Sequence, residues 1–152
     1  MGNPIEILLV EDNPSDAELT IHALQKSKMI STIRHLQDGA EALDFLLCRG
    51  AFSQRQFDSP PRLVLLDLKL PKVDGLGVLE QIKSDPRTKA IPVILLTSSK
   101  EERDMVQGYK LGVNSYIQKP VNFGEFQDVV RQLGMYWLLV NSKPPNAAFS
   151  RS

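Results

Sequence analysis

Four short apolar runs in the sequence each end at residues that can bind a metal ion or a phosphoryl group. The runs, with the residues that follow them, are Ile5–Val10 with Glu11 and Asp12, Leu63–Leu66 with Asp67, Val93–Leu96 with Thr97, and Val113–Ile117 with Lys119. Runs of this length, rich in leucine and β-branched residues, predict strands that are buried on both faces of a parallel sheet. Because functional groups in an open parallel sheet lie outside the carboxyl ends of the strands, we expect these side chains to meet at one edge.

The residue types at this edge favour phosphoryl chemistry with a divalent cation. Carboxylates such as Glu11, Asp12 and Asp67 are the oxygen ligands that Mg²⁺ prefers, and without a cation they would repel one another and raise at least one pKa. Asp67 is also the candidate nucleophile, because an aspartate can form an aspartyl phosphate. Lys119 and Thr97 supply the ammonium and hydroxyl groups that would stabilise charge on the transferred oxygens.

Helical patterns between the runs predict the elements that position these side chains. A fifth, less apolar strand is expected at Ile30–Leu36, nearer the edge of the sheet. The expected helices run from Asn13 to about Met29, from Ala40 to about Cys48, from Asp74-Gly75 to Asp85-Pro86, over Lys100–Leu111, and from Asn122 to about Val140. This alternation predicts an α/β fold, a doubly wound five-stranded parallel sheet with helices on both faces.

Two polar segments are expected to lie outside these regular elements. The stretch Arg49–Arg62 is longer than a typical connection and is predicted to be a mobile insertion. Residues 1–141 are expected to form one domain with an extended last helix, and residues 142–152 are expected to form a flexible C-terminal tail.

Composition argues against several classes of function. The chain of 152 residues carries 18 basic and 18 acidic residues, so no bulk charge attracts nucleic acid or an anionic membrane. The single cysteine, Cys48, excludes an internal disulfide and a cysteine-based zinc site, and it is expected to pack in a helix as a small hydrophobe. His22 and His35 lack a second ligand at metal spacing and are expected to be structural or exposed. With no signal peptide and no apolar run of about 20 residues, the sequence predicts a soluble, cytoplasmic protein.

Four sequence blocks resemble the response-regulator receiver domain of two-component signalling, and they occur in that family's order. The blocks are VEDNPSD, LLDLKLPKVDG, VILLTSS and YIQKPV, within about residues 5–139. The resemblance implies the flavodoxin-like (βα)5 receiver fold and transfer of a phosphoryl group from a sensor histidine kinase to Asp67. The further roles that it implies by position are Mg²⁺ ligation by Glu11, Asp12, Asp67 and the backbone carbonyl of Lys69, phosphate binding by Lys119 before a cis Pro120, and a switch made of the Thr97 hydroxyl and the Tyr116 ring.

The C-terminal segment narrows the resemblance. The residues VNFGEFQDVVRQLGMYWLLVNSKPP, with the loop RQFDSPPR, are similar to small cyanobacterial regulators paired with bacteriophytochromes. This similarity implies a light-regulated histidine kinase as the partner. Ser98 stands where the family often has alanine or glycine, and with Lys69 and Ser99 it leaves the lifetime of the phosphorylated state open.

The apolar stretch Met135–Val140 covers every side of a helix, whereas a surface helix needs only a stripe of about 100°. The residues expected to face the core are Phe126, Val129, Val130, Leu133 and Trp137. The residues left in need of another cover are Tyr136, Leu138, Leu139 and Val140. Either the tail folds back over them, or they form the interface of a homodimer, since exposed apolar patches mark interfaces.

The leading hypothesis is a single-domain response regulator that switches its protein contacts, not an enzyme that acts on an external substrate. No output domain fits in the remaining residues, so output is expected through an unidentified downstream protein. A constitutive pseudo-receiver is the alternative, and the complete set of Asp12, Asp67, Thr97 and Lys119 argues against it. A phosphorelay intermediate is a further alternative. A phosphatase of the aspartyl-phosphate class does not fit, because the residues after the first strand do not match its pattern.

Overall fold

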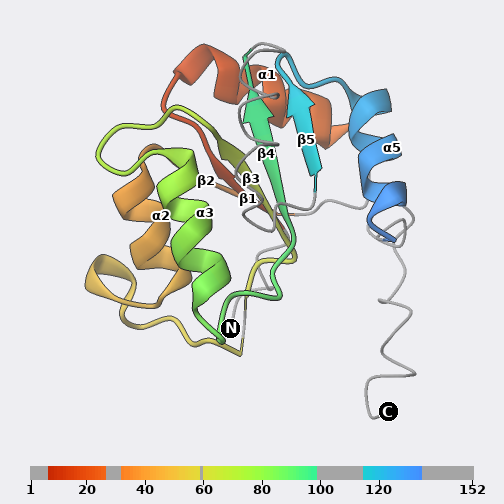
Figure 1. Cartoon of the computed structure of the whole chain (residues 1–152). Coiled ribbons are helices and arrows are strands. Elements are labelled where there is room, and N and C mark those ends of the chain that lie inside the picture. The colour runs from red at the N-terminus through yellow and green to blue at the C-terminus, as the bar shows by residue number, and fades with distance from the viewer. Residues whose placement is uncertain (1–6, 27–31, 59, 99–114, 135–152) are drawn as a thin grey trace.

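One parallel sheet of five strands forms the centre of the protein (Figure 1). A computed structural model describes residues 7–26, 32–58, 60–98 and 115–134 of the chain. The strands are β1 Ile7–Val10, β2 Ile33–Leu36, β3 Leu63–Asp67, β4 Val93–Thr97 and β5 Ser115–Gln118. Their order, β2-β1-β3-β4-β5, makes β1 and β3 neighbours, so the chain winds outward in both directions from this pair. The predicted doubly wound fold is confirmed.

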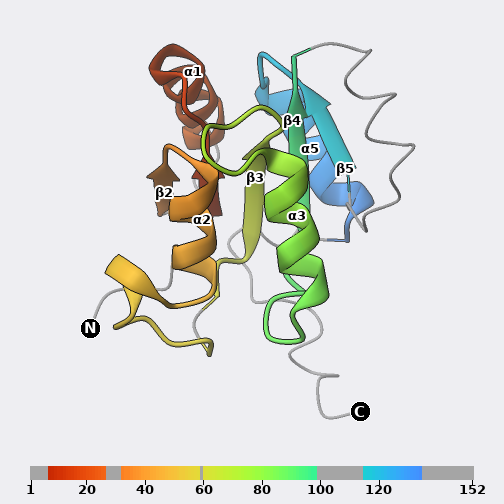
Figure 2. The ribbon, with the colours of Figure 1, turned by 60° about the vertical axis from the view of Figure 1, so that its left-hand side comes forward.

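Helices cover both faces of the sheet, as Figures 1 and 2 show. Helices α1 and α5 pack on one face, and α2 and α3 pack on the other. The helices are α1 Pro14–Gln25, α2 Gly39–Leu46, α3 Gly75–Ser84 and α5 Phe123–Gln132. Alternate residues of β1 contribute to the two cores, and all are fully buried. Burial on both faces explains why β1, β3 and β4 are apolar runs that do not alternate with polar residues.

These four helices all begin with a capping side chain, next to the carboxyl ends of the strands. Each capping oxygen accepts a hydrogen bond of 2.7–2.9 Å from a backbone N–H three residues later. The capping residues are Asn13, Asp38, Asp74 and Asn122. Proline at the first position of α1 suits this geometry, because its fixed φ matches the helix and its missing N–H would have no helical partner. The caps therefore anchor the loops that carry the predicted site residues.

The segment after α2 differs from the prediction at Cys48. Helix α2 ends at Leu46, and Cys48 lies beyond it with φ 54°, so the prediction that Cys48 packs within a helix is wrong. The stretch Arg49–Arg62, predicted to be a mobile insertion, begins with a short 3-10 helix and packs on α2. The ring of Phe52 meets that of Phe45 edge-on, with centroids 5.2 Å apart. The guanidinium of Arg55 lies 3.8 Å from the centre of the Phe45 ring and donates to the Phe45 carbonyl.

The last helix is shorter than predicted. It ends at Gln132 and not near Val140, because Gly134 adopts φ 73°, a left-handed conformation that ends a helix. Several predictions lie outside the described residues: the helix Lys100–Leu111, the tail 142–152, and the dimer candidates Tyr136, Leu138, Leu139 and Val140.

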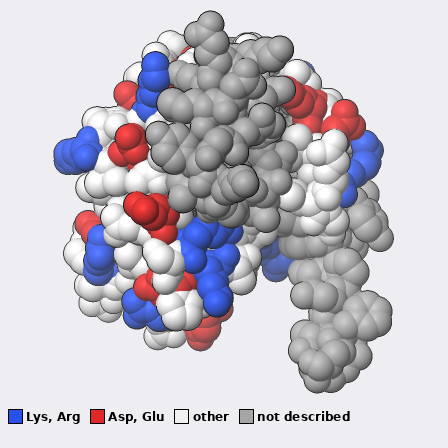
Figure 3. Space-filling view, viewed as in Figure 1, with Lys and Arg blue, Asp and Glu red and all other residues white. Residues whose placement is uncertain are grey.

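The surface of the described residues carries mixed charge. Acidic and basic side chains are interspersed over the face shown in Figure 3, in keeping with the equal numbers of the two kinds in the sequence. None of the helices within the described residues is long and apolar enough to cross a membrane.

Candidate metal and phosphoryl-acceptor site

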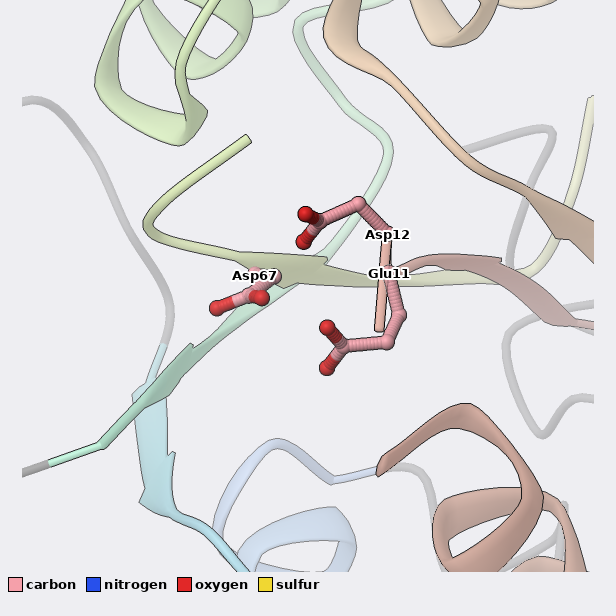
Figure 4. Close-up of side chains that lie close together, drawn as sticks. All are labelled: Glu11, Asp12 and Asp67. Carbon is pink, nitrogen blue, oxygen red and sulfur yellow. The ribbon is translucent and has the colours of Figure 1, made fainter. Parts of the chain in front are cut away.

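Three carboxylates meet at the carboxyl ends of β1 and β3. Glu11 and Asp12 follow β1, and Asp67 is the last residue of β3, the neighbouring strand. One oxygen from each of the three lies within 4.8 Å of the others, and Figure 4 shows the side chains extending to the same side of the strand ends. Glu11 and Asp67 are buried, whereas Asp12 is exposed. The structure thus brings together the acids that the sequence predicts at this edge.

Lys119, which follows the edge strand β5, places its ammonium group among these acids. Its backbone N–H donates to the Thr97 carbonyl at 2.7 Å, which aligns the end of β5 with that of β4. Its Nζ lies 3.1 Å from Glu11 Oε1, 3.2 Å from Asp67 Oδ2 and 3.0 Å from Asp16 Oδ2. The lysine side chain is only 14% exposed. One largely buried cation is therefore shared by three carboxylates.

Burial and mutual repulsion shift the protonation of this cluster. Burial, and then the neighbouring Asp67 carboxylate, raise the pKa of Glu11 to about 7. For Lys119 burial acts to lower the pKa, but the carboxylates of Asp16, Asp67 and Glu11 outweigh it and raise the pKa above its usual value. The lysine is therefore a permanent cation at neutral pH. It does not fully neutralise the acids around it, so the site favours a further cation.

Thr97 brings a hydroxyl group to the same edge. It is the last residue of β4 and follows Leu96, the residue that pairs with Asp67 in the sheet. Thr97 is fully buried, and among the described residues its Oγ1 has no hydrogen-bond partner. A buried hydroxyl without a partner costs free energy, and such groups often serve a ligand or reacting group. The site therefore combines oxygen ligands, a cation and an uncommitted hydroxyl.

The comparisons with known proteins agree with this geometry. The model of the family described as "Response regulator receiver domain" matches residues 7–131. The chain belongs to this family. The family resemblance given by the four sequence blocks is therefore confirmed. Receiver domains are phosphoacceptor signalling modules that interact with histidine kinases and with downstream partners.

Three relatives of this receiver are particularly similar to it. The probable methanogenesis regulatory protein FilR2 of Methanothrix harundinacea is 43% identical over 93% of this chain and 89% of its own. Response regulator Rcp1 of Synechocystis is 40% identical over 89% and 90% of the two chains. The structure of the bacteriophytochrome response regulator AtBRR is 48% identical, covers 93% of this chain and 100% of its own, and superposes with a TM-score of 0.84. A structure of Rcp1 with bound Mn²⁺ covers 93% and 99% of the chains with a TM-score of 0.71.

The donor set of this receiver fits a divalent metal ion. Its carboxylate oxygens are hard ligands, and their partial burial with incomplete charge compensation provides the electrostatic drive to bind a cation. Receiver domains bind a divalent metal, and the Mn²⁺-bound form of Rcp1 shows one in a relative. Lys69, predicted to offer its backbone carbonyl, lies exposed in the loop after Asp67.

The loop after Asp67 is held close to the end of β3. The N–H of Gly75 donates to the Leu68 carbonyl at 2.8 Å, so the start of α3 folds back onto the strand end. A Cβ at Gly75 would overlap the backbone carbonyl of Asp67, and only glycine allows this approach. The receiver therefore fixes the backbone around Asp67 from both the strand and the helix side.

Two further residues of the receiver contact residues of the site. His35 on β2 holds the turn after β1, with Nε2 2.8 Å from the Glu11 carbonyl, and the structural role expected for it is confirmed. Asp16 was not among the predicted site residues, although it forms the shortest of the three ion pairs to Lys119. Its one sequence signal is its place in the first turn of the helix after β1. Acids are common there as helix-start charge, so the signal is not specific.

Tyr116, the predicted switch aromatic, lies apart from the acids. It is half-buried on β5, where it pairs with Leu95 and packs against the core on the α2 and α3 face. Thr97 and Tyr116 therefore stand on adjacent strands of the receiver.

Proposed function

We propose that this receiver is a phosphorylation switch in which Asp67 accepts a phosphoryl group from the phosphohistidine of a sensor histidine kinase. The observation that carries the proposal is the position of Asp67, in reach of two acids suited to a metal and of the Lys119 ammonium at 3.2 Å. In the transfer, an oxygen of Asp67 forms a bond to phosphorus. The phosphorus–nitrogen bond of the donor breaks, and its electron pair returns to the imidazole.

In this proposal a metal ion and Lys119 stabilise the negative charge on the transferring oxygens from two sides. A Mg²⁺ ion would be held by the side chains of Glu11, Asp12 and Asp67 and by the backbone carbonyl of Lys69. The ion, when bound, neutralises charge on the transferring oxygens. Lys119 donates hydrogen bonds to the same oxygens from the other side, and its raised pKa keeps it charged.

Switching is assigned to Thr97 and Tyr116. The buried Thr97 hydroxyl has no partner among the described residues, and a phosphoryl oxygen on Asp67 would supply one. Movement of Thr97 toward that oxygen frees space for the half-buried Tyr116 to turn inward. The surface around β5 and α5 then differs between the two states, which alters protein contacts.

A bacteriophytochrome is the kinase that the relatives favour. AtBRR is called a bacteriophytochrome response regulator, and this chain is 48% identical to it. FilR2, at 43% identity, is called a probable methanogenesis regulator, so the pathway differs among similar receivers. Four further statements remain predictions. They are the downstream protein, the cytoplasmic location, the division into a domain of residues 1–141 and a tail, and a homodimer formed through Tyr136, Leu138, Leu139 and Val140.

One experiment tests the phosphoacceptor directly. The protein is incubated with Mg²⁺ and acetyl phosphate, and its mass is measured beside Asp67→Asn and a control, Asp128→Asn, which alters an exposed acid on α5. We expect one added phosphate on the wild type and on the control, and none on Asp67→Asn. A wild type that gains no phosphate would contradict the proposal and favour the pseudo-receiver. Transfer from an autophosphorylated bacteriophytochrome kinase, faster than from an unrelated histidine kinase, would support the named pathway.

A further inference from the structure

The ammonium group of Lys119 has no hydrogen-bond donor left over in this structure. An ammonium group carries three N–H donors, and three carboxylates lie 3.0–3.2 Å from Nζ. Two of these partners, Glu11 and Asp67, belong to the group of acids suited to a metal, together with Asp12. The third, Asp16, does not belong to that group. It is therefore the partner of Lys119 whose oxygens would bind neither a metal ion nor the phosphorus atom.

The backbone of Asp16 is held in place by the start of α1. It lies in the first turn of α1, and its backbone N–H donates to the capping oxygen of Asn13 at 2.9 Å. The same helix is anchored to the core by buried residues further along: Ala17, Thr20, Ala23 and Leu24. The backbone that carries the Asp16 carboxylate is thus fixed by the helix cap and by the packing of α1 on the core.

The ion pair between Asp16 and Lys119 joins two distant parts of the chain. Asp16 follows β1 on α1, whereas Lys119 follows β5, 103 residues later. A lysine side chain has four rotatable bonds and loses considerable freedom when its charged end is held in one position. An anchor that restrains this end before the reaction therefore lowers the entropy lost when Lys119 meets the phosphoryl oxygens.

We propose that Asp16 is a positioning residue that holds the Lys119 ammonium ready for the phosphoryl oxygens on Asp67. This inference rests on the proposed function of Asp67. During transfer, Lys119 exchanges its hydrogen bond to the Asp67 carboxylate for one to a phosphoryl oxygen and keeps its bond to Asp16. Asp16 itself touches neither the metal nor the phosphoryl group.

The test compares rates of phosphorylation by acetyl phosphate at saturating Mg²⁺. We expect Asp16→Ala to react about 10-fold more slowly than the wild type, which is typical of a loss of positioning. Asp16→Asn, whose amide oxygen can still accept from Nζ, is expected to stay within about twofold of the wild type. The matched control is Glu18→Ala, an exposed acid on the same helix, and it is expected to react at the wild-type rate. Mg²⁺ affinity, measured by calorimetry, is expected to change less than about twofold in all three variants.

A double variant shows whether the effect passes through Lys119. In a Lys119→Ala background, adding Asp16→Ala is expected to cause no further loss of rate, because the positioned group is absent. An equal loss in both backgrounds would overturn the inference, as would an unchanged rate in Asp16→Ala or an equal loss in Asp16→Asn. If the wild type itself gains no phosphate, the proposed function fails. If the wild type reacts and only the expected loss in Asp16→Ala is missing, the proposed function stands and this inference alone fails.

Discussion

Lys119 and Lys83 are both partly buried and lie at opposite ends of the strands, but their surroundings differ. Lys119, after β5, is shared by three carboxylates that raise its pKa. Lys83, in the last turn of α3, donates to the backbone carbonyls of Lys89 and Ile91 before β4, and burial lowers its pKa. The first lysine balances charge within a site, whereas the second closes a turn.

The same contrast holds for two buried threonines and two acids. Thr88 donates its hydroxyl to the Ile82 carbonyl at 2.8 Å, whereas the hydroxyl of Thr97 has no partner among the described residues. Hydrogen bonds from Arg87 lower the pKa of Asp85 to about 2, whereas burial and Asp67 raise that of Glu11 to about 7. Among the described residues, Lys83 and Thr88 at the amino end are hydrogen-bonded, whereas the carboxyl end holds a hydroxyl without a partner and an acid with a raised pKa.

The largest difference between the two ends is expected in the pH dependence of stability. Between the ordinary pKa of 4.5 and the folded value of about 7, folded Glu11 holds a proton that the unfolded chain has lost. Without metal, raising the pH through this window therefore lowers the free energy of unfolding, by about 3 kcal/mol once pH 7 is passed. Denaturant titrations of the wild type and Glu11→Gln measure this, and the difference between the two proteins is expected to grow with pH. A constant difference from pH 4 to 8 would contradict the raised pKa.

The two lysines are expected to differ next most strongly, in the rate of phosphorylation. Lys119→Met removes the cation that faces the transferring oxygens, and we expect acetyl phosphate to react about 100-fold more slowly. Lys83→Met removes hydrogen bonds at the other end of the sheet, and the rate is expected to stay within about twofold of the wild type. Mass spectrometry over time measures both rates. Similar losses in the two variants would show that the effect is one of general stability.

The two threonines are expected to respond with opposite signs when changed to valine. Thr88→Val leaves the Ile82 carbonyl without its buried donor, and we expect the free energy of unfolding to fall by about 1–2 kcal/mol. Thr97→Val removes a buried hydroxyl that has no partner within the described part of the chain, and we expect a gain of about 1 kcal/mol. Urea unfolding of the metal-free protein measures both. A loss in both variants would indicate that Thr97 has a partner in solution.

The sequence predicted the strands and the acids well because each depends on local pattern. A strand buried on both faces must be apolar throughout, and the residue that ends it must lie at the sheet edge. The apolar pattern predicts a last helix that continues past Gly134, whereas α5 ends at Gln132, because a glycine with positive φ ends a helix whatever residues follow it. The sequence alone could not show that Lys119 reaches Asp16, since the direction of a flexible side chain depends on the twist of the sheet and on the packing of α1.

The smallest expected effect belongs to Asp85, and it has the opposite sign to that of Glu11. Because Arg87 lowers the pKa of Asp85 in the folded state, its contribution to stability is present above pH 3.8 and is lost as the pH falls toward 2. The pair lies at the surface, with the Arg87 side chain 58% exposed and that of Asp85 20% exposed, so the loss is expected to be small and to shrink further in high salt. Urea unfolding of the wild type, Asp85→Asn and the control Asp128→Asn from pH 5 to 2 measures it. If the contribution of Asp85 to stability were instead lost as the pH rises, Asp85 would behave like Glu11. The contrast between the two ends of the sheet would then not hold for these two acids.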